Sequence, residues 1–160
     1  MKKNRVIAGA MGVMMLGAMV LPVHAADNTM SVTYRQPNAY TVTIPQSVNL
    51  SNGATSNKIE VKDVNLEPNA EIKIKISQGV DNNGVIELSR EQDTNTKAVT
   101  TISKEQSGTG IKLNEDFVTF TANGSQSLYY SKIAAKDGGQ VKAGNYNGTL
   151  TFTVTAPEKN

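Results

Sequence analysis

The sequence predicts an all-β fold, and three observations support this prediction. Apolar and polar residues alternate with a period of two along most of the chain, whereas the helical period of about 3.6 residues is nearly absent. Four Asn-Gly pairs lie between the alternating segments, and these residues tolerate the positive φ angles of tight hairpin turns. Aromatic residues make up only 5% of the chain, which indicates a thin aliphatic core. Together these features predict an antiparallel two-sheet β-sandwich of about eight to ten strands.

The first half of the chain contains four predicted strands. Residues 30–34 (MSVTY) and 40–44 (YTVTI) each place apolar or aromatic side chains on one face. Residues 58–61 (KIEV) form a shorter segment of the same kind. In residues 71–77 (EIKIKIS), three isoleucines alternate with charged residues, which is typical of a half-buried strand.

The second half contains six further predicted strands, separated by Gly-rich and Asn-rich turns. Residues 89–109 are largely polar, so long loops or a short helical turn are an alternative there. A closed β-barrel is the alternative to the sandwich as a whole. The six segments are 84–89, 97–103, 110–113, 116–122, 127–134 and 148–155.

Residues 1–25 have the features of a bacterial secretory signal peptide. Three basic residues precede an apolar run at 6–21, and small residues occupy the −3 and −1 positions before a cleavage site after Ala25. An uncleaved membrane anchor is the alternative, because the apolar run approaches the length that spans a bilayer. We expect cleavage, which leaves one domain at 26–160 in an extracellular or cell-surface location. The protein would cross the periplasm if the producing cell has an outer membrane.

The charge of the expected mature chain argues against nucleic-acid binding. The full chain carries a net charge of +2, but three of its 16 Lys and Arg residues and none of its 14 Asp and Glu residues lie in the signal peptide. Residues 26–160 therefore have 13 basic and 14 acidic residues and a net charge of −1. We expect neither a nucleic-acid partner nor membrane insertion after signal cleavage.

The residue types needed for common catalytic sites are missing from the expected mature chain. The chain has no Cys, and its one histidine, His24, lies in the signal peptide. This excludes Cys-His and Ser-His-Asp nucleophiles and His/Cys metal sites, so we expect no enzyme activity, no cofactor and no metal. A hydrolase that uses paired carboxylates is the remaining enzymatic alternative. Glu115 and Asp116 are poor partners for it because neighbours on a strand point to opposite faces.

Two other site types are compatible with the residues present. A glycan-binding or ligand-binding module would gather exposed tyrosines on one surface. A covalent cross-link between a strand Lys and a strand Asn would need a carboxylate nearby. The tyrosines are Tyr34, Tyr129, Tyr130 and Tyr146, and the cross-link candidates are Lys58, Lys62, Asn145 and Asn147.

The segment 143–155, AGNYNGTLTFTVT, resembles the C-terminal strand of bacterial fimbrial subunits. Subunits of the colonisation-factor type end in Ala-Gly-x-Tyr-x-Gly followed by alternating apolar residues. The segment is also similar to the end of immunoglobulin-like modules in small secreted proteins of Gram-positive bacteria, and residues 40–50 (YTVTIPQSVNL) resemble that second group.

The fimbrial resemblance implies that the all-β fold is an antiparallel immunoglobulin-like β-sandwich and that its role is structural rather than catalytic. Subunits of the chaperone–usher kind lack one strand, and an N-terminal extension of a neighbouring subunit fills the gap. The corresponding donor here is 28–34, and the alternative is that 30–34 is the first strand of its own domain. We therefore expect a non-enzymatic surface or adhesion module, with other protein chains and glycans as candidate partners. The donor side chains would be Met30, Val32 and Tyr34, and the groove wall would be Leu150, Phe152 and Val154.

Overall fold

The computed structural model describes residues 31–50 and 55–158. The predicted signal peptide, Met30 and the Asn52-Gly53 pair lie outside the described residues. The chain divides into two units, Met1–Tyr34 and Arg35–Asn160. The strands all belong to the second unit, and the described residues contain no helix. The prediction of an all-β fold is therefore confirmed.

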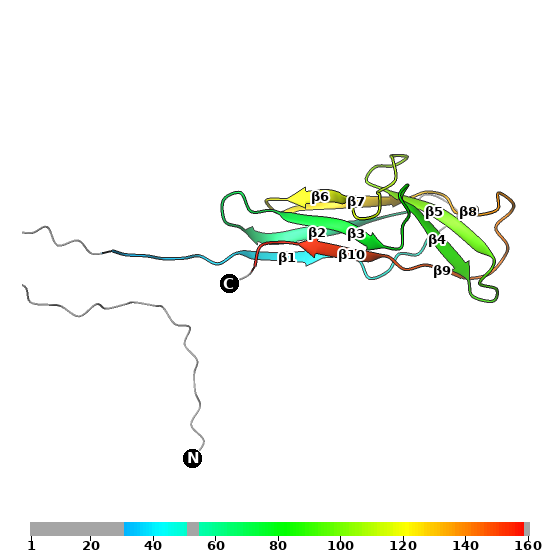
Figure 1. Cartoon of the computed structure of the whole chain (residues 1–160), viewed down its shortest axis with the longest axis horizontal. Coiled ribbons are helices and arrows are strands. Elements are labelled where there is room, and N and C mark those ends of the chain that lie inside the picture. The colour runs from blue at the N-terminus through cyan, green and yellow to red at the C-terminus, as the bar shows by residue number, and fades with distance from the viewer. Residues whose placement is uncertain (1–30, 51–54, 159–160) are drawn as a thin grey trace, which may run out of the picture. The chain divides into compact units, whose positions relative to one another are not determined.

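Ten strands in the described residues form two antiparallel sheets (Figure 1). The larger sheet has the order β1-β2-β7-β5-β4-β9, with β8 paired to β5, and the smaller sheet has the order β10-β3-β6. These are two separate open sheets rather than one closed barrel. The strands are β1 Ala39–Thr43, β2 Thr55–Asn65, β3 Ile72–Gln78, β4 Val85–Arg90, β5 Lys97–Ser103, β6 Asp116–Phe120, β7 Gly124–Tyr130, β8 Ala134–Ala135, β9 Tyr146–Asn147 and β10 Thr151–Thr155.

The core lies between the sheets and is mainly aliphatic. Ile72, Ile74 and Ile76 on β3 are fully buried, as the alternation in 71–77 predicts. The facing sheet contributes Ile59 from β2 and Leu128 from β7. Burial of each large aliphatic side chain stabilises the fold by about 1.5–3 kcal/mol. The chain has no cysteine, so this packing is not supplemented by disulfides.

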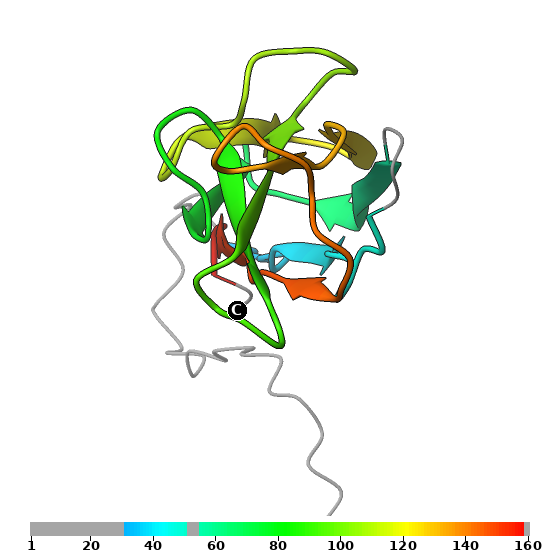
Figure 2. The ribbon, with the colours of Figure 1, turned by 90° about the vertical axis from the view of Figure 1, so that its right-hand side faces the viewer.

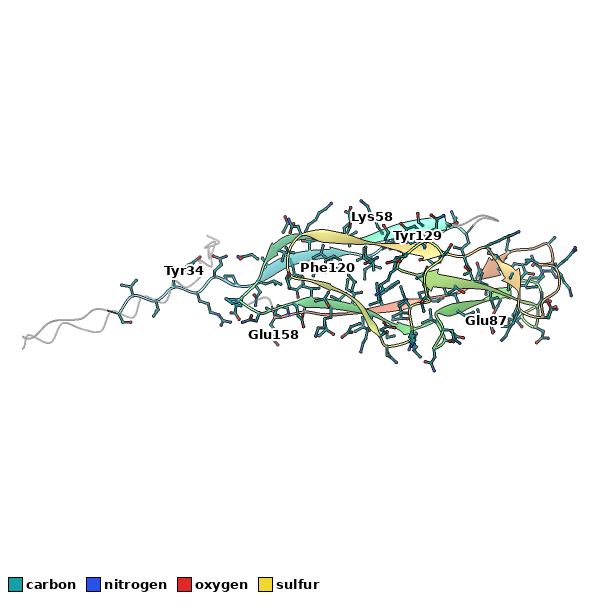
Figure 3. The ribbon with its side chains drawn as sticks, turned by 90° about the horizontal axis from the view of Figure 1, so that it is seen from above. Tyr34, Lys58, Glu87, Phe120, Tyr129 and Glu158 are labelled. Atoms are coloured by element: carbon teal, nitrogen blue, oxygen red, sulfur yellow. The ribbon has the colours of Figure 1, made fainter. Side chains whose placement is uncertain are left out.

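The pairing of β2 with β7 sets which side chains point outward. Ser56 lies opposite Tyr129, and Lys58 lies opposite Ser127. Lys58 and Tyr129 therefore share the outer face of this sheet (Figure 3). Tyr130 points the other way and is buried, so the adjacent tyrosines divide between core and surface, as the period of a strand requires.

The strands β1 and β10 are edge strands of different sheets. Among the described residues, β1 pairs with β2 and β10 pairs with β3, so each has one backbone edge without a neighbouring strand. The two strands nevertheless lie next to each other, as Figures 1 and 2 both show. The two sheets are thus not joined by strand pairing between β1 and β10.

One of the predicted turns is confirmed, and a second is not. Gly84 has a φ of 75° and ends the turn that connects β3 and β4. The Asp81 side chain accepts hydrogen bonds from the backbone N–H groups of Asn83 (2.7 Å) and Val85 (2.9 Å), which closes this turn. Asn123 lies in the connection between β6 and β7, but Gly124 is the first residue of β7. The two strands belong to different sheets, so this Asn-Gly pair forms no hairpin turn.

Three other local predictions are also wrong. Residues 31–34 of the predicted strand 30–34 form no strand, and neither a strand nor a turn occurs in 31–38. Residues 110–113 form only a single bridge, between Gly110 and Ser103. The Asn147-Gly148 pair is not a hairpin turn, because Asn147 belongs to β9 and the final strand begins only at Thr151. In this last case, pairing with β4 overrides the local turn preference.

Candidate functional site: a groove between two edge strands

A groove of about 980 Å³ opens where the chain segments beside β1 and β10 separate. We call it the edge groove. One wall is the segment 44–50, which follows β1, and the other is 144–152, which leads into β10. Apolar side chains from both sheets form the part of the lining that we call the floor, and polar residues, among them Gln46, Asn57 and Glu91, complete the lining. Its main apolar side chains are Ile44, Leu88, Leu128, Ile133, Leu150 and Phe152.

Phe152 connects the groove to the core. Its ring makes an edge-to-face contact with Phe117 of β6, with centroids 6.4 Å apart and an interplanar angle of 66°. Such pairs contribute about 0.5–1.5 kcal/mol beyond the area that they bury. Phe152 is only half-buried, so part of this ring is left for an occupant of the groove.

The structure places the predicted wall residues in different environments. Leu150 and Phe152 line the edge groove and are half-buried. Val154 does not line it, and its side chain is 37% exposed.

The predicted donor residues lie in the first unit of the chain. Val32 and Tyr34 are 80% and 85% exposed, which is unusual for large apolar and aromatic side chains. Met30 lies outside the described residues.

A polar cluster fixes the 144–152 wall at the end of β4. The Glu91 carboxylate accepts hydrogen bonds from the side-chain amides of Asn147 (2.7 Å) and Asn145 (3.1 Å). The backbone N–H of Glu91 also donates to the Asn145 carbonyl, at 2.9 Å. The two amides, first Asn147 and then Asn145, hold the pKa of Glu91 below its usual value because they stabilise the charged form. Sequence patterns do not reveal this cluster, since Glu91 lies in a polar stretch far from both asparagines.

The Lys and Asn residues considered for a covalent cross-link lie in separate places. Lys58 and Lys62 form ion pairs with Glu60 on the outer face of β2. The candidate asparagines are on or next to β9, at the other end of the sheet order, and bind Glu91. The structure therefore does not bring a candidate Lys to a candidate Asn.

The tyrosines considered for a glycan platform do not form one surface in the second unit. Tyr130 is buried against the core, and burial raises the pKa of its hydroxyl. Tyr129 faces outward from β7, whereas Tyr146 is on β9 and its hydroxyl donates to the Lys142 carbonyl at 3.1 Å.

The carboxylates at the strand surfaces are held by separate partners. Glu87 pairs with Lys136 and Lys97, whereas Glu91 binds only amides among the contacts described above. Within 31–50 and 55–158, no three His, Cys, Asp or Glu residues come together as a metal site would require. In the same residues, no helix has the length and apolar character needed to cross a membrane.

No family model matches this chain, and no curated protein has significant sequence similarity to it.

Proposed function

We propose that this protein is a non-enzymatic structural or adhesion subunit of a bacterial surface, of the fimbrial kind, that assembles by β-strand addition. Residues 28–34 of one copy would lie beside β10 of the next copy and cover its edge groove. The observation that carries this proposal is an edge strand, β10, that borders an open apolar groove. An immunoglobulin-like sandwich that lacks one strand has this arrangement.

The backbone of β10 offers the hydrogen bonds that an added strand needs. Only β3 pairs with β10 among the described residues, so the opposite edge presents backbone N–H and C=O groups. An extended peptide at such an edge gains main-chain hydrogen bonds and inserts every second side chain into the groove. The groove runs along 144–152 and reaches the upper end of the range of about 300–1,000 Å³ for small-molecule pockets. Its length and apolar floor suit an extended chain.

Residues 28–34 have the pattern that this groove would select. Met30, Val32 and Tyr34 alternate with Thr29, Ser31 and Thr33, so a strand here has one apolar and one hydroxyl-bearing face. Val32 is 80% exposed and belongs to a stretch, 31–38, that forms no strand. Its burial in an apolar groove would contribute about 1.5–3 kcal/mol.

Insertion into a second copy is favoured over insertion into the same chain. In the same chain, 28–34 could lie in the groove only if 35–38 reversed direction immediately before β1. Residues 31–38 contain no turn, and Pro37 disfavours the helical conformation at the preceding Gln36. Asn38 is 7% exposed and is held by hydrogen bonds to two other segments. These constraints oppose a reversal, so the donor segment is directed to another copy.

The proposal is tested by the oligomeric state of the chain Ala26–Asn160. We expect size exclusion with light scattering to show a ladder of oligomers for the wild-type chain. Val32→Asp should give a monomer, because a charge buried in the groove costs several kcal/mol. Thr33→Asp is the matched control, since its carboxylate would point away from the groove, and it should still form the ladder.

Circular dichroism should show a folded β-sheet spectrum for all three chains, because residue 32 lies outside the strands of the domain itself. The oligomers should differ from the monomer only by the few residues of the added strand. A wild-type chain that stays monomeric at high concentration would contradict the proposal. Equal assembly of Val32→Asp and Thr33→Asp would contradict it as well.

A further inference from the structure

Two hydrogen bonds join the start of β1 to the chain that follows β10. The side-chain amide of Asn38 donates to the Glu158 carbonyl at 3.2 Å. The hydroxyl of Tyr40 donates to the Pro157 carbonyl at 3.1 Å. We call this pair of contacts the clasp. It connects the two edge strands at one end, whereas the edge groove separates them at the other end.

Asn38 is fixed independently of the β10 tail. It is one of the few buried polar residues, with 7% exposure, and its side-chain oxygen accepts a hydrogen bond from the Glu67 backbone N–H at 2.8 Å. A buried side chain whose donor and acceptor are both used has little freedom to move. The clasp is therefore anchored to the loop after β2 as well as to β1.

The groove lining ends at Phe152 on β10, and the clasp lies beyond it, past the end of that strand. A strand that enters beside 148–155 could extend past Thr155 only by displacing Asn38 and Tyr40 from the carbonyls of 157 and 158. On the basis of the proposed strand addition, we infer that the clasp is a stop that fixes the register of the added strand. Asn38 and Tyr40 are thus positioning residues that lie outside the apolar floor.

The donor segment needs such a stop because its own pattern does not define one register. Met30, Val32 and Tyr34 recur every second residue, so a slip of two residues still points apolar side chains into the groove. Only a shift of the donor strand by an odd number of residues is unfavourable, because it places Thr and Ser side chains in the groove. A fixed stop beyond the groove favours one of the registers in which the apolar side chains are buried equally well.

Disulfide trapping in the full chain Ala26–Asn160, which has no native Cys, tests this inference. Thr153→Cys on β10 is combined in turn with Thr29→Cys, Ser31→Cys or Thr33→Cys in the donor segment. Disulfides need Cα atoms about 4.4–6.8 Å apart, and a slip of two residues moves the donor by about 6.8 Å. After oxidation with diamide, non-reducing gels should show strong intermolecular cross-linking for one of the three pairs.

Variants of the clasp should spread the cross-links to a second pair. Tyr40→Phe removes only the hydroxyl, and Asn38→Asp keeps the acceptor for the Glu67 N–H while it loses the amide donor. Tyr129→Phe is the matched control, because it deletes a tyrosine hydroxyl on the outer face of β7, outside both the edge groove and the clasp. We expect this control to keep the single cross-linked pair.

The outcomes separate this inference from the proposed function. Oligomers that cross-link through one pair in every variant, or through all three pairs in the wild-type background, would overturn the clasp as a stop. Absence of oligomers, or oligomers that cross-link through none of the pairs, would overturn strand addition itself. If Asn38→Asp does not fold, Tyr40→Phe alone decides the result, because its ring still fills the same space.

Discussion

Gly148 lies where the chain passes from β9 in one sheet to β10 in the other. A Cβ atom at this position would be 2.7 Å from the Leu88 side chain and 3.0 Å from the Glu87 carbonyl oxygen, so any larger residue would require both neighbours to move. At Gly144, a Cβ would lie 2.6 Å from Nε of Arg90, and the φ of 143° also favours glycine. The two glycines of the AGNYNG segment are therefore explained by the close packing of this wall on the end of β4.

Glu60 provides a test of surface electrostatics at the level of one side chain. Hydrogen bonds from Lys58 and then Lys62 lower its pKa from 4.5 to about 2. Because the folded-state pKa is depressed, the stabilisation is fully present above pH 4.5 and is lost as the pH falls toward 2. Glu60→Gln should therefore lower the thermal midpoint at neutral pH by a small amount, and the difference from wild type should vanish at pH 2.

The measurement is a series of thermal melts across this pH range at low and high salt. The difference should also shrink with added salt, because the three side chains face solvent. A difference that stays constant down to pH 2 would show that Glu60 acts through packing instead.

Single residues of the candidate site could be predicted only where the local pattern carries the information. The alternation around Phe152 predicts that this side chain faces inward, and it does line the groove. The roles of Asn38 and Glu91 could not be predicted, because their partners lie far away in the sequence. Long-range side-chain hydrogen bonds depend on which strands become neighbours, and the sequence alone does not specify that.

At the scale of elements, β3 is the strand whose packing is most easily tested. It is the middle strand of the smaller sheet and buries Ile74 completely. Ile74→Ala should destabilise the domain by about 2–5 kcal/mol, because it removes a buried side chain and leaves a cavity. Lys75→Ala on the outer face of the same strand should change the stability by no more than about 0.5 kcal/mol. Urea unfolding of both variants measures the difference, and equal effects would contradict the assigned faces of β3.

Strands with long alternating patterns were predictable, whereas short strands made by tertiary pairing were not. The prediction for 97–103 matches β5 in both bounds. The two-residue strands β8 and β9 exist only because β5 and β4 lie beside them, so their own residues carry no strand pattern. Conversely, the alternation in 30–34 predicts a strand, but residues 31–34 belong to no strand in the described part of the chain. That mismatch is what strand addition between copies would explain.

At the scale of the whole molecule, the fold class follows from the sequence but the groove does not. Period-two alternation and turn residues predict an antiparallel sandwich without regard to strand order. The groove arises from strand order, because β1 and β10 are edges of different sheets that meet without pairing. No local signal in either strand identifies it as an edge.

The most direct test of strand addition is hydrogen exchange, measured on the separated monomer and oligomer fractions of the chain Ala26–Asn160. An amide that enters a sheet ladder is protected from exchange, whereas an amide in an unpaired segment is not. We predict protection of 28–34 in the oligomers and rapid exchange of the same residues in the monomer. Within the second unit, the largest gain in protection should fall on 151–155. Oligomers in which 28–34 still exchange at the rate of an unfolded chain would contradict the account.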